Sequence, residues 1–126
     1  MDMNNLKDQN LHKELEKLLS ISDIIGTALV NRNGLLIASN LPREIDDRKF
    51  CAMAATMFAA IETAASTLTS KFVDNLTVEF NDFQLIIMGA DEQLILVSLL
   101  NLGINLGLIF IEIEETIKNV KKILNR

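Results

Sequence analysis

Two segments, one near each end of the chain, carry apolar residues at helical spacing. Residues 5–19 place four leucines on one face and charged residues on the other. In residues 105–124, aliphatic side chains form a single stripe, with Glu and Lys opposite. An apolar stripe with a period near 3.6 residues is typical of an amphipathic helix. The pattern therefore predicts a helix in each segment, packed against a core through one face.

Five apolar runs of strand length lie between these helices. The predicted strands cover residues 24–31, 35–39, 73–80, 83–90 and 94–100. The third run alternates apolar and polar residues, which is typical of a strand with one exposed face. The last two runs are almost continuously apolar, as in central strands covered on both faces. We therefore expect a sheet with helices on both faces and the third strand toward an edge.

The stretch VNRNGLLIAS, residues 30–39, separates the first two strands. Asn33 and Gly34 form an Asn-Gly pair, which supplies the positive φ angles of a tight hairpin turn. We interpret this pair as a structural turn, without a role in binding a ligand. Asn81 and Asp82 are candidates for a second two-residue turn.

A further helix is predicted from Asp46 and Asp47 to about Ser70. From residue 51 to residue 70 its only charged residue is Glu62. Steps of 100° per residue separate a bulky side from a side of small residues. The bulky side holds Phe50, Met53, Met57, Ile61 and Leu68.

Small residues on a helix allow another backbone to approach closely. Two explanations remain open: the helix is covered within its own domain, or its small side is an interface between subunits. The second explanation gives a candidate interface on the helix and on the predicted edge strand, because exposed strand edges invite pairing. The candidate residues are Ala52, Ala55, Thr56, Ala59, Glu62, Thr63 and Ser66 on the helix, with Leu76, Thr77, Val78 and Glu79 on the strand.

A symmetric dimer can use both parts of this interface at once. The edge strands would pair antiparallel, so that two sheets become one, and the two helices would lie side by side. We expect Ala59→Glu to weaken dimerisation more than it weakens the fold of the monomer.

The order of the predicted elements is helix, two strands, helix, three strands, helix. This order predicts an α+β domain with a five-stranded antiparallel sheet. We expect residues 1–126 to form a single domain, with a core between about residues 11 and 124.

Charge and composition narrow the classes of function. Hydrophobic residues make up 49% of the chain and charged residues 23%, which is a globular composition. The net charge of −5 argues against binding to nucleic acid or to anionic lipid. Residues 94–111 carry no charge, but they contain Asn101 and Asn105, and acidic residues flank them. We interpret this segment as a buried strand, a turn and the start of a helix, without insertion into a membrane.

Residues that carry chemistry are few. The chain has one histidine, His12, and one cysteine, Cys51, which are 39 positions apart on different predicted helices. No group of residues has zinc-ligand spacing, and no Walker-type glycine loop occurs. We therefore predict no enzyme activity, no cofactor and no metal. Cys51 is expected to be a buried packing thiol, and a single cysteine together with the polar start favours a cytoplasmic protein.

The segment LEKLLSISDIIGTALVNRNGLLIAS, residues 15–39, resembles the opening of Roadblock/LC7 domain proteins. The Ala/Met-rich helix at residues 50–68 and INLGLIFIEIEE at residues 104–115 are also similar to that family. The order and spacing of these motifs carry the resemblance, which covers about residues 11–124.

The resemblance implies a profilin-like/longin-like α-β-α sandwich that forms a homodimer, or a heterodimer with a paralogue. It also implies a role beside Ras-like small GTPases, as a GTPase-activating partner or a docking scaffold. The family has no universal catalytic residues. Arg32 and Arg43 are the candidates for an arginine that acts on a partner, but both flank turns, where we expect them to be solvated. Two other functions stay open: a structural adaptor in a motor or membrane-docked complex, and a small-molecule sensor.

Overall fold

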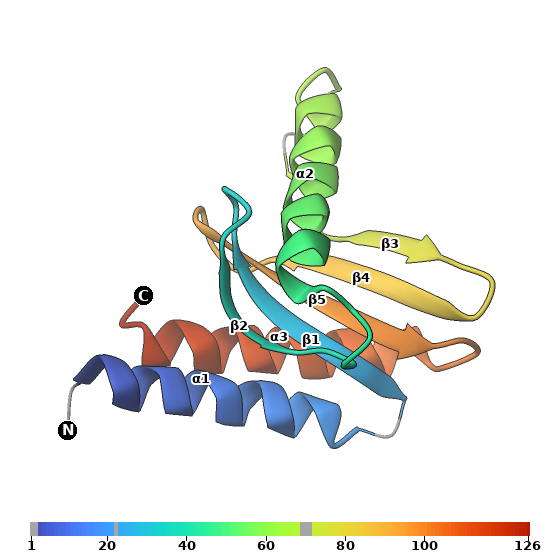
Figure 1. Cartoon of the computed structure of the whole chain (residues 1–126). Helices are drawn as coiled ribbons and strands as arrows, with labels where there is room; N and C mark the ends of the chain where they lie inside the picture. The colour runs from blue at the N-terminus through green and yellow to red at the C-terminus, as the bar shows by residue number, and fades with distance from the viewer. Residues whose placement is uncertain (1–2, 22, 69–71) are drawn as a thin grey trace.

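The computed structural model describes residues 3–21, 23–68 and 72–126. Its elements follow the predicted order (Figure 1). They are α1 (Met3–Leu19), β1 (Ile24–Asn31), β2 (Leu36–Asn40), α2 (Asp47–Ala65), β3 (Leu76–Glu79), β4 (Phe83–Gly89), β5 (Leu94–Asn101) and α3 (Leu106–Ile123).

Two predicted boundaries differ from the structure by three residues or more. Helix α2 stops at Ala65, and Ser66 caps it by donating its backbone N–H to the carbonyls of Glu62 and Ala64. The predicted end at Ser70 lies outside the described residues. Strand β3 begins at Leu76, three residues later than predicted, because pairing with β4 begins only there.

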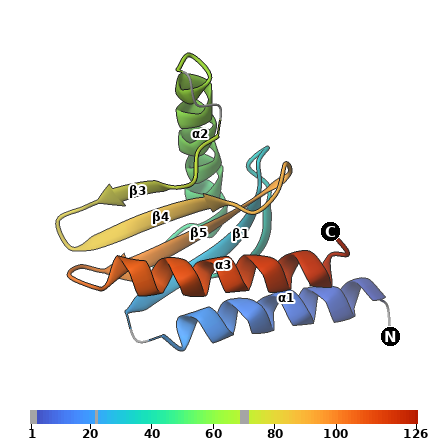
Figure 2. The same cartoon turned by 180° about the vertical axis from the view of Figure 1, so that it is seen from behind.

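The sheet has the order β2-β1-β5-β4-β3, and every neighbouring pair is antiparallel. The prediction that the third strand lies at an edge is confirmed. Helices α1 and α3 lie side by side on one face of the sheet, and α2 stands on the other (Figures 1 and 2).

Two cores fill the sandwich, one on each side of the sheet. Leu15, Leu29, Leu96 and Ile113 belong to the core under α1 and α3. Phe58, Leu85 and Val97 belong to the core under α2. All seven residues from Leu94 to Leu100 are buried, and β5 contributes to both cores. The prediction of a sheet covered on both faces is therefore confirmed.

The turn between β1 and β2 lies where it was predicted but has a different geometry. The loop has three residues, Arg32–Gly34, and it is closed by a 2.8 Å bond from Asn31 N–H to the Leu35 carbonyl. Within this loop, only Gly34 has a positive φ, of 94°. The idea that Asn33 and Gly34 share the positive φ angles was therefore wrong. Asn33 instead donates its backbone N–H to the side chain of Asn31 at 2.8 Å, which stabilises the turn before the glycine.

The uncharged segment at residues 94–111 consists of β5, a turn and the start of α3, as predicted. Gly103 has a φ of 76° in this turn, and Asn105 caps α3 with its side-chain oxygen. Among the described residues, no helix is long and apolar enough to cross a membrane.

Cys51 is fully buried, which confirms the prediction of a packing thiol. Burial and the nearby carboxylate of Asp47 raise the pKa of Cys51 to about 11. At neutral pH the side chain is therefore almost entirely in its unreactive thiol form.

Thr27 and Ser98 face each other across β1 and β5 and are both fully buried. Within the described ranges, neither hydroxyl oxygen has a hydrogen-bond partner. Thr27→Val replaces the hydroxyl with a methyl group of similar shape, so we expect it to raise the free energy of unfolding by about 1 kcal/mol. Urea unfolding measures this change.

The control is Thr116→Val, because Thr116 is also buried but its hydroxyl donates to the Glu112 carbonyl at 3.0 Å. This variant should gain no stability. A Thr27→Val variant no more stable than the wild type would show that the Thr27 hydroxyl carries no unsatisfied-group penalty.

Candidate functional site

Helix α2 covers the sheet with only part of its length. Its buried residues are Cys51, Ala54, Ala55 and Phe58, all in its first two thirds. The C-terminal part of the helix extends past the sheet (Figure 1), and none of residues 59–65 is buried. We call residues 59–65 the projecting half of α2. It stands apart from the core of its own chain, so its side chains are available to a partner.

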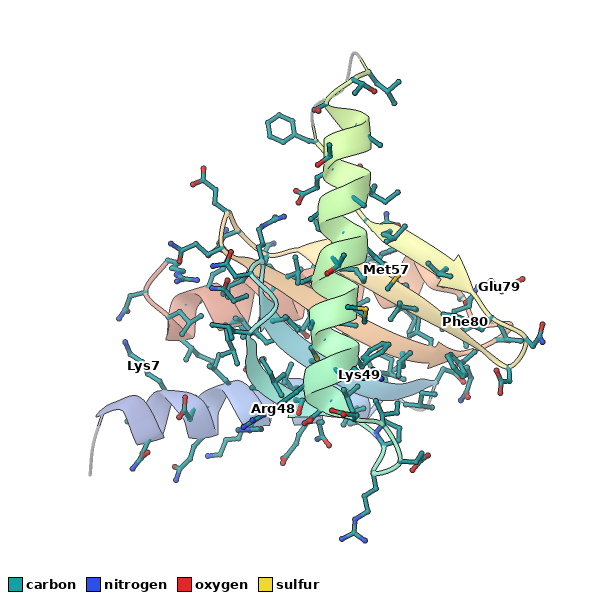
Figure 3. The ribbon with its side chains drawn as sticks, turned by 45° about the horizontal axis from the view of Figure 1, so that its top comes forward. Lys7, Arg48, Lys49, Met57, Glu79 and Phe80 are labelled. Atoms are coloured by element: carbon teal, nitrogen blue, oxygen red, sulfur yellow. The ribbon has the colours of Figure 1, made fainter. Side chains whose placement is uncertain are left out.

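The bulky side of α2 leaves large apolar side chains exposed. Met53 is 53% exposed and Ile61 is 39% exposed, although both are large and apolar. Met57 is half-buried and packs in the same cluster as Leu76 and Val78 of β3. Figure 3 shows Met57 on the side of the helix that faces β3. Together with β3 (Leu76–Glu79), these three α2 side chains form what we call the α2–β3 surface, and exposed apolar patches of this kind mark contact sites.

The small side of α2 is partly covered by its own chain. Ala55 is buried by its own chain, which leaves little of its surface for the predicted contact with a partner. Ala52 lies beside the β1–β2 turn, where a Cβ on Gly34 would lie 3.5 Å from the Ala52 Cα. For Ala52 and Ala55, the better of the two explanations is therefore that the helix is covered within its own domain. Thr56, Ala59, Thr63 and Ser66 are exposed and keep their place in the predicted interface.

Strand β3 has one edge without a neighbour in the sheet. Phe80 donates its N–H to the Phe83 carbonyl at 2.8 Å, which identifies the hydrogen-bonded pair at the end of the β3–β4 ladder. Because such pairs alternate along antiparallel strands, the N–H groups of Thr77 and Glu79 point away from β4. Both residues are exposed, so β3 can accept a further strand.

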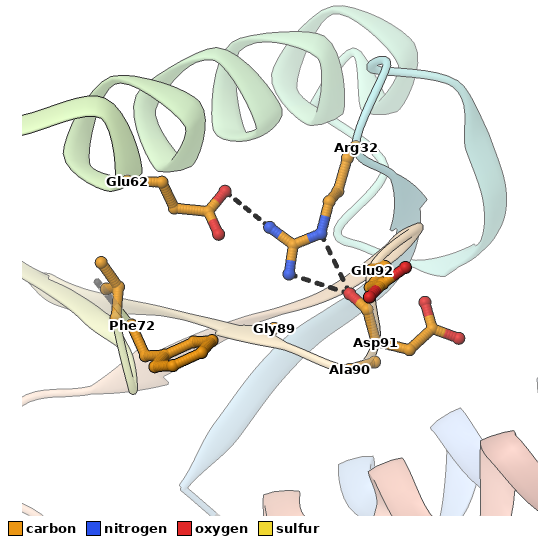
Figure 4. A pocket seen from close by; sticks show the side chains of 8 residues that line it. Arg32, Glu62, Phe72, Gly89, Ala90, Asp91 and Glu92 are labelled. Atoms are coloured by element: carbon orange, nitrogen blue, oxygen red, sulfur yellow. Dashed lines mark hydrogen bonds and ion pairs between the residues drawn. The ribbon is translucent and has the colours of Figure 1, made fainter. Parts of the chain in front are cut away.

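Arg32 is held by protein groups on two sides, so the prediction that it is solvated was wrong. Its Nη1 donates to Glu62 Oε1 at 2.6 Å, and its Nε and Nη2 donate to the Asp91 carbonyl at 3.0 and 2.9 Å (Figure 4). The sequence carried one signal for this contact, because Glu62 is the only charged residue between residues 51 and 70. Arg43, by contrast, is exposed as predicted.

Arg32 and Glu62 also line an open depression of about 580 Å³, together with Phe72, Gly89 and Asp91 (Figure 4). Arg32 and Glu62 bond to each other across it, and the Asp91 carbonyl accepts from the Arg32 guanidinium. In the part of the chain that the structure describes, no group of three or more His, Cys, Asp or Glu residues could hold a metal ion.

Curated relatives of this chain come from the archaeon Methanocaldococcus jannaschii. Uncharacterized protein MJ1340 is 31% identical over 111 residues, covering 88% of this chain and 96% of the relative. Uncharacterized protein MJ0310 is also 31% identical over 111 residues, with the same coverage of both chains.

Solved structures share the fold at lower identity. MglB of Myxococcus xanthus superposes with a TM-score of 0.86 at 21% identity, covering 94% of this chain and 90% of its own. A structure described as MglB with tetrameric arrangement gives a TM-score of 0.84 at 17% identity, covering 93% of this chain and 89% of its own. A Roadblock/LC7 domain from Streptomyces avermitilis gives 0.83 at 16% identity, covering 90% of this chain and 97% of its own.

The family model of the Roadblock/LC7 domain matches residues 11–99. The match contains residues 11–19 of α1, the hairpin, α2 and nearly all of the following three strands. Together with the longin-like sandwich and the relatives above 30% identity, it shows that this chain belongs to the Roadblock/LC7 domain family.

Proposed function

We propose that this chain forms a homodimer that serves as a non-catalytic regulator or docking scaffold for a Ras-like small GTPase. The observation that carries the proposal is the α2–β3 surface, where an open strand edge adjoins exposed Met53 and Ile61. An apolar surface beside an open edge favours burial against another chain.

A second copy of the chain fits this surface. Antiparallel pairing of two β3 strands about a two-fold axis would join two five-stranded sheets into one. The same axis would bring the two α2 helices together, so that Met53, Met57 and Ile61 leave water. A neighbour of the same fold, described as MglB with tetrameric arrangement, supports assembly from several copies.

Family membership supports the choice of a GTPase as the partner, because the family resemblance implies a role beside Ras-like GTPases. The net charge of −5 favours a partner with a basic contact face. A dimer would offer that partner a continuous sheet and a pair of helices as a rigid platform.

The test is binding to purified Ras-like GTPases of the source organism, each loaded with GDP or a non-hydrolysable GTP analogue. We expect the wild type to retain one GTPase in one nucleotide state, and a monomeric variant to bind it about tenfold or more weakly. Hydrolysis rates with and without the protein then separate an activator from a scaffold.

Failure to bind any of these GTPases in either state would refute the proposal. Capture of a defined non-GTPase complex by the dimer would then favour the structural adaptor. A ligand-induced rise in melting temperature without a protein partner would favour the sensor.

A further inference from the structure

The projecting half of α2 is connected to the rest of the protein by one side-chain contact. Among the described residues, Glu62 is its only side chain that bonds to another element, through the 2.6 Å contact with Arg32. Phe58 is the last buried residue of α2, so none of residues 59–65 is anchored by a buried side chain. The direction of the projecting half is therefore open to influence from the contact between Glu62 and Arg32.

Contacts other than the one with Glu62 already hold Arg32 in place. Its backbone N–H donates to the Gln93 carbonyl at 2.8 Å, and its guanidinium donates twice to the Asp91 carbonyl. The guanidinium carbon also lies 5.4 Å from the centre of the Phe58 ring, within cation–π range. The guanidinium is thus held by the β4–β5 turn and by the last buried residue of α2.

Gly89 leaves the space that the guanidinium occupies. A Cβ on Gly89 would lie 2.8 Å from Arg32 Nη2, closer than van der Waals contact allows. Because Gly89 has no side chain, the Arg32 guanidinium can lie against β4 and reach Glu62 (Figure 4).

We propose that Arg32 is a positioning residue for dimerisation: through Glu62 it sets the direction of the projecting half of α2 and so preorganises the α2–β3 surface. This inference rests on the proposed dimer. A partly exposed ion pair adds little to the stability of a fold. Holding a binding element in its bound direction, however, lowers the entropy lost on association.

The test removes the contact from the helix side and leaves Arg32 in place. We expect Glu62→Ala to raise the dimer Kd about tenfold, as measured by sedimentation equilibrium. The matched control is Glu92→Ala, which removes an exposed acid that lines the same depression. It should leave the Kd unchanged, and Glu62→Gln should give an intermediate Kd that no longer depends on salt.

A second readout follows the helix itself in a monomer. Thr77→Pro is expected to be monomeric, and in that background Glu62→Ala should speed amide hydrogen exchange about tenfold at residues 59–65. Exchange in β4 and β5 and the urea midpoint should not change. A purely structural role for Arg32 would instead shift the midpoint and the exchange of the sheet together.

The outcomes separate this inference from the proposed function. If Ile61→Glu dissociates the dimer but Glu62→Ala changes neither the Kd nor the exchange of residues 59–65, the role of Arg32 is refuted and the dimer stands. If the wild type is monomeric, the proposed function and the role of Arg32 in dimerisation both fail.

Discussion

Ile61→Glu is expected to dissociate the proposed dimer, raising its Kd more than about 100-fold. A two-fold axis places the new carboxylate of each copy in the same interface, and both charges would lose their water on association. Ile61 is 39% exposed and lies beyond the last buried residue of α2, so the monomer should keep its fold. Sedimentation equilibrium gives the Kd, and urea unfolding of the separated monomer checks the fold.

The matched variant is Ala59→Glu, which adds the same charge to the projecting half of α2. Two residues correspond to about 200° around a helix, so Ala59 lies nearly opposite Ile61, on the small side. The sequence predicts that Ala59→Glu weakens dimerisation more than folding, whereas the structure favours the larger effect at Ile61. A larger effect at Ala59 would place the interface on the small side, and two dimeric variants would exclude α2 from the interface.

Thr77→Pro is expected to raise the dimer Kd about 30-fold or more. Proline removes the Thr77 N–H, which points away from β4, and the two-fold axis doubles the loss at roughly 1 kcal/mol for each hydrogen bond. The bonds between β3 and β4 use the N–H groups of Leu76 and Val78, so the sheet of the monomer should survive.

Two controls separate edge pairing from damage to β3. Thr77→Ala keeps the N–H and should remain dimeric, whereas Val78→Pro breaks the ladder to β4 and should lower the free energy of unfolding. A Thr77→Pro protein that dimerises like the wild type would show that the β3 edges do not pair. Slow amide exchange at Thr77 and Glu79, seen only at concentrations where the dimer forms, would support pairing independently.

The two surfaces tested by these variants have different physical roles. In the proposed dimer, the edge of β3 would provide directional hydrogen bonds, which would specify the register and the antiparallel direction of pairing. The exposed side chains of α2 provide apolar area, which favours association without specifying direction. Both are needed for a dimer of defined geometry, which a GTPase would recognise as one platform.

Most of the secondary structure could be predicted because each element must bury apolar side chains on one face or on both. The period of 3.6 in α1 and α3 reflects one buried face, and the nearly continuous apolar runs of β4 and β5 reflect burial on both faces. Boundaries were less accurate where pairing decides them. Valine favours β-strands, yet β3 begins three residues after Val73, at Leu76, where pairing with β4 begins.

The candidate site was harder to predict than the fold. Periodicity separates the two sides of α2, but it does not say which side faces the sheet. Packing of the helix on β1 and β5 decides which positions are covered, namely Cys51, Ala55 and Phe58. That orientation exposes Met53 and Ile61 and covers Ala55, which shifts the apolar contact surface from the small side toward the bulky side.

By itself the sequence determined the order of the elements, the edge position of β3 and the hairpin turn at Gly34. It also carried the resemblance to the Roadblock/LC7 family. These features depend on patterns of residues within a few neighbouring turns or strands. Only the tertiary structure decided the contacts of Arg32 and the exposure of Met53 and Ile61 on α2. Arg32 lies 30 residues from Glu62 and 59 residues from Asp91, so neither contact leaves a local pattern in the sequence. Such contacts form only when the hairpin, the β4–β5 turn and the helix are brought together by the packing of the two cores.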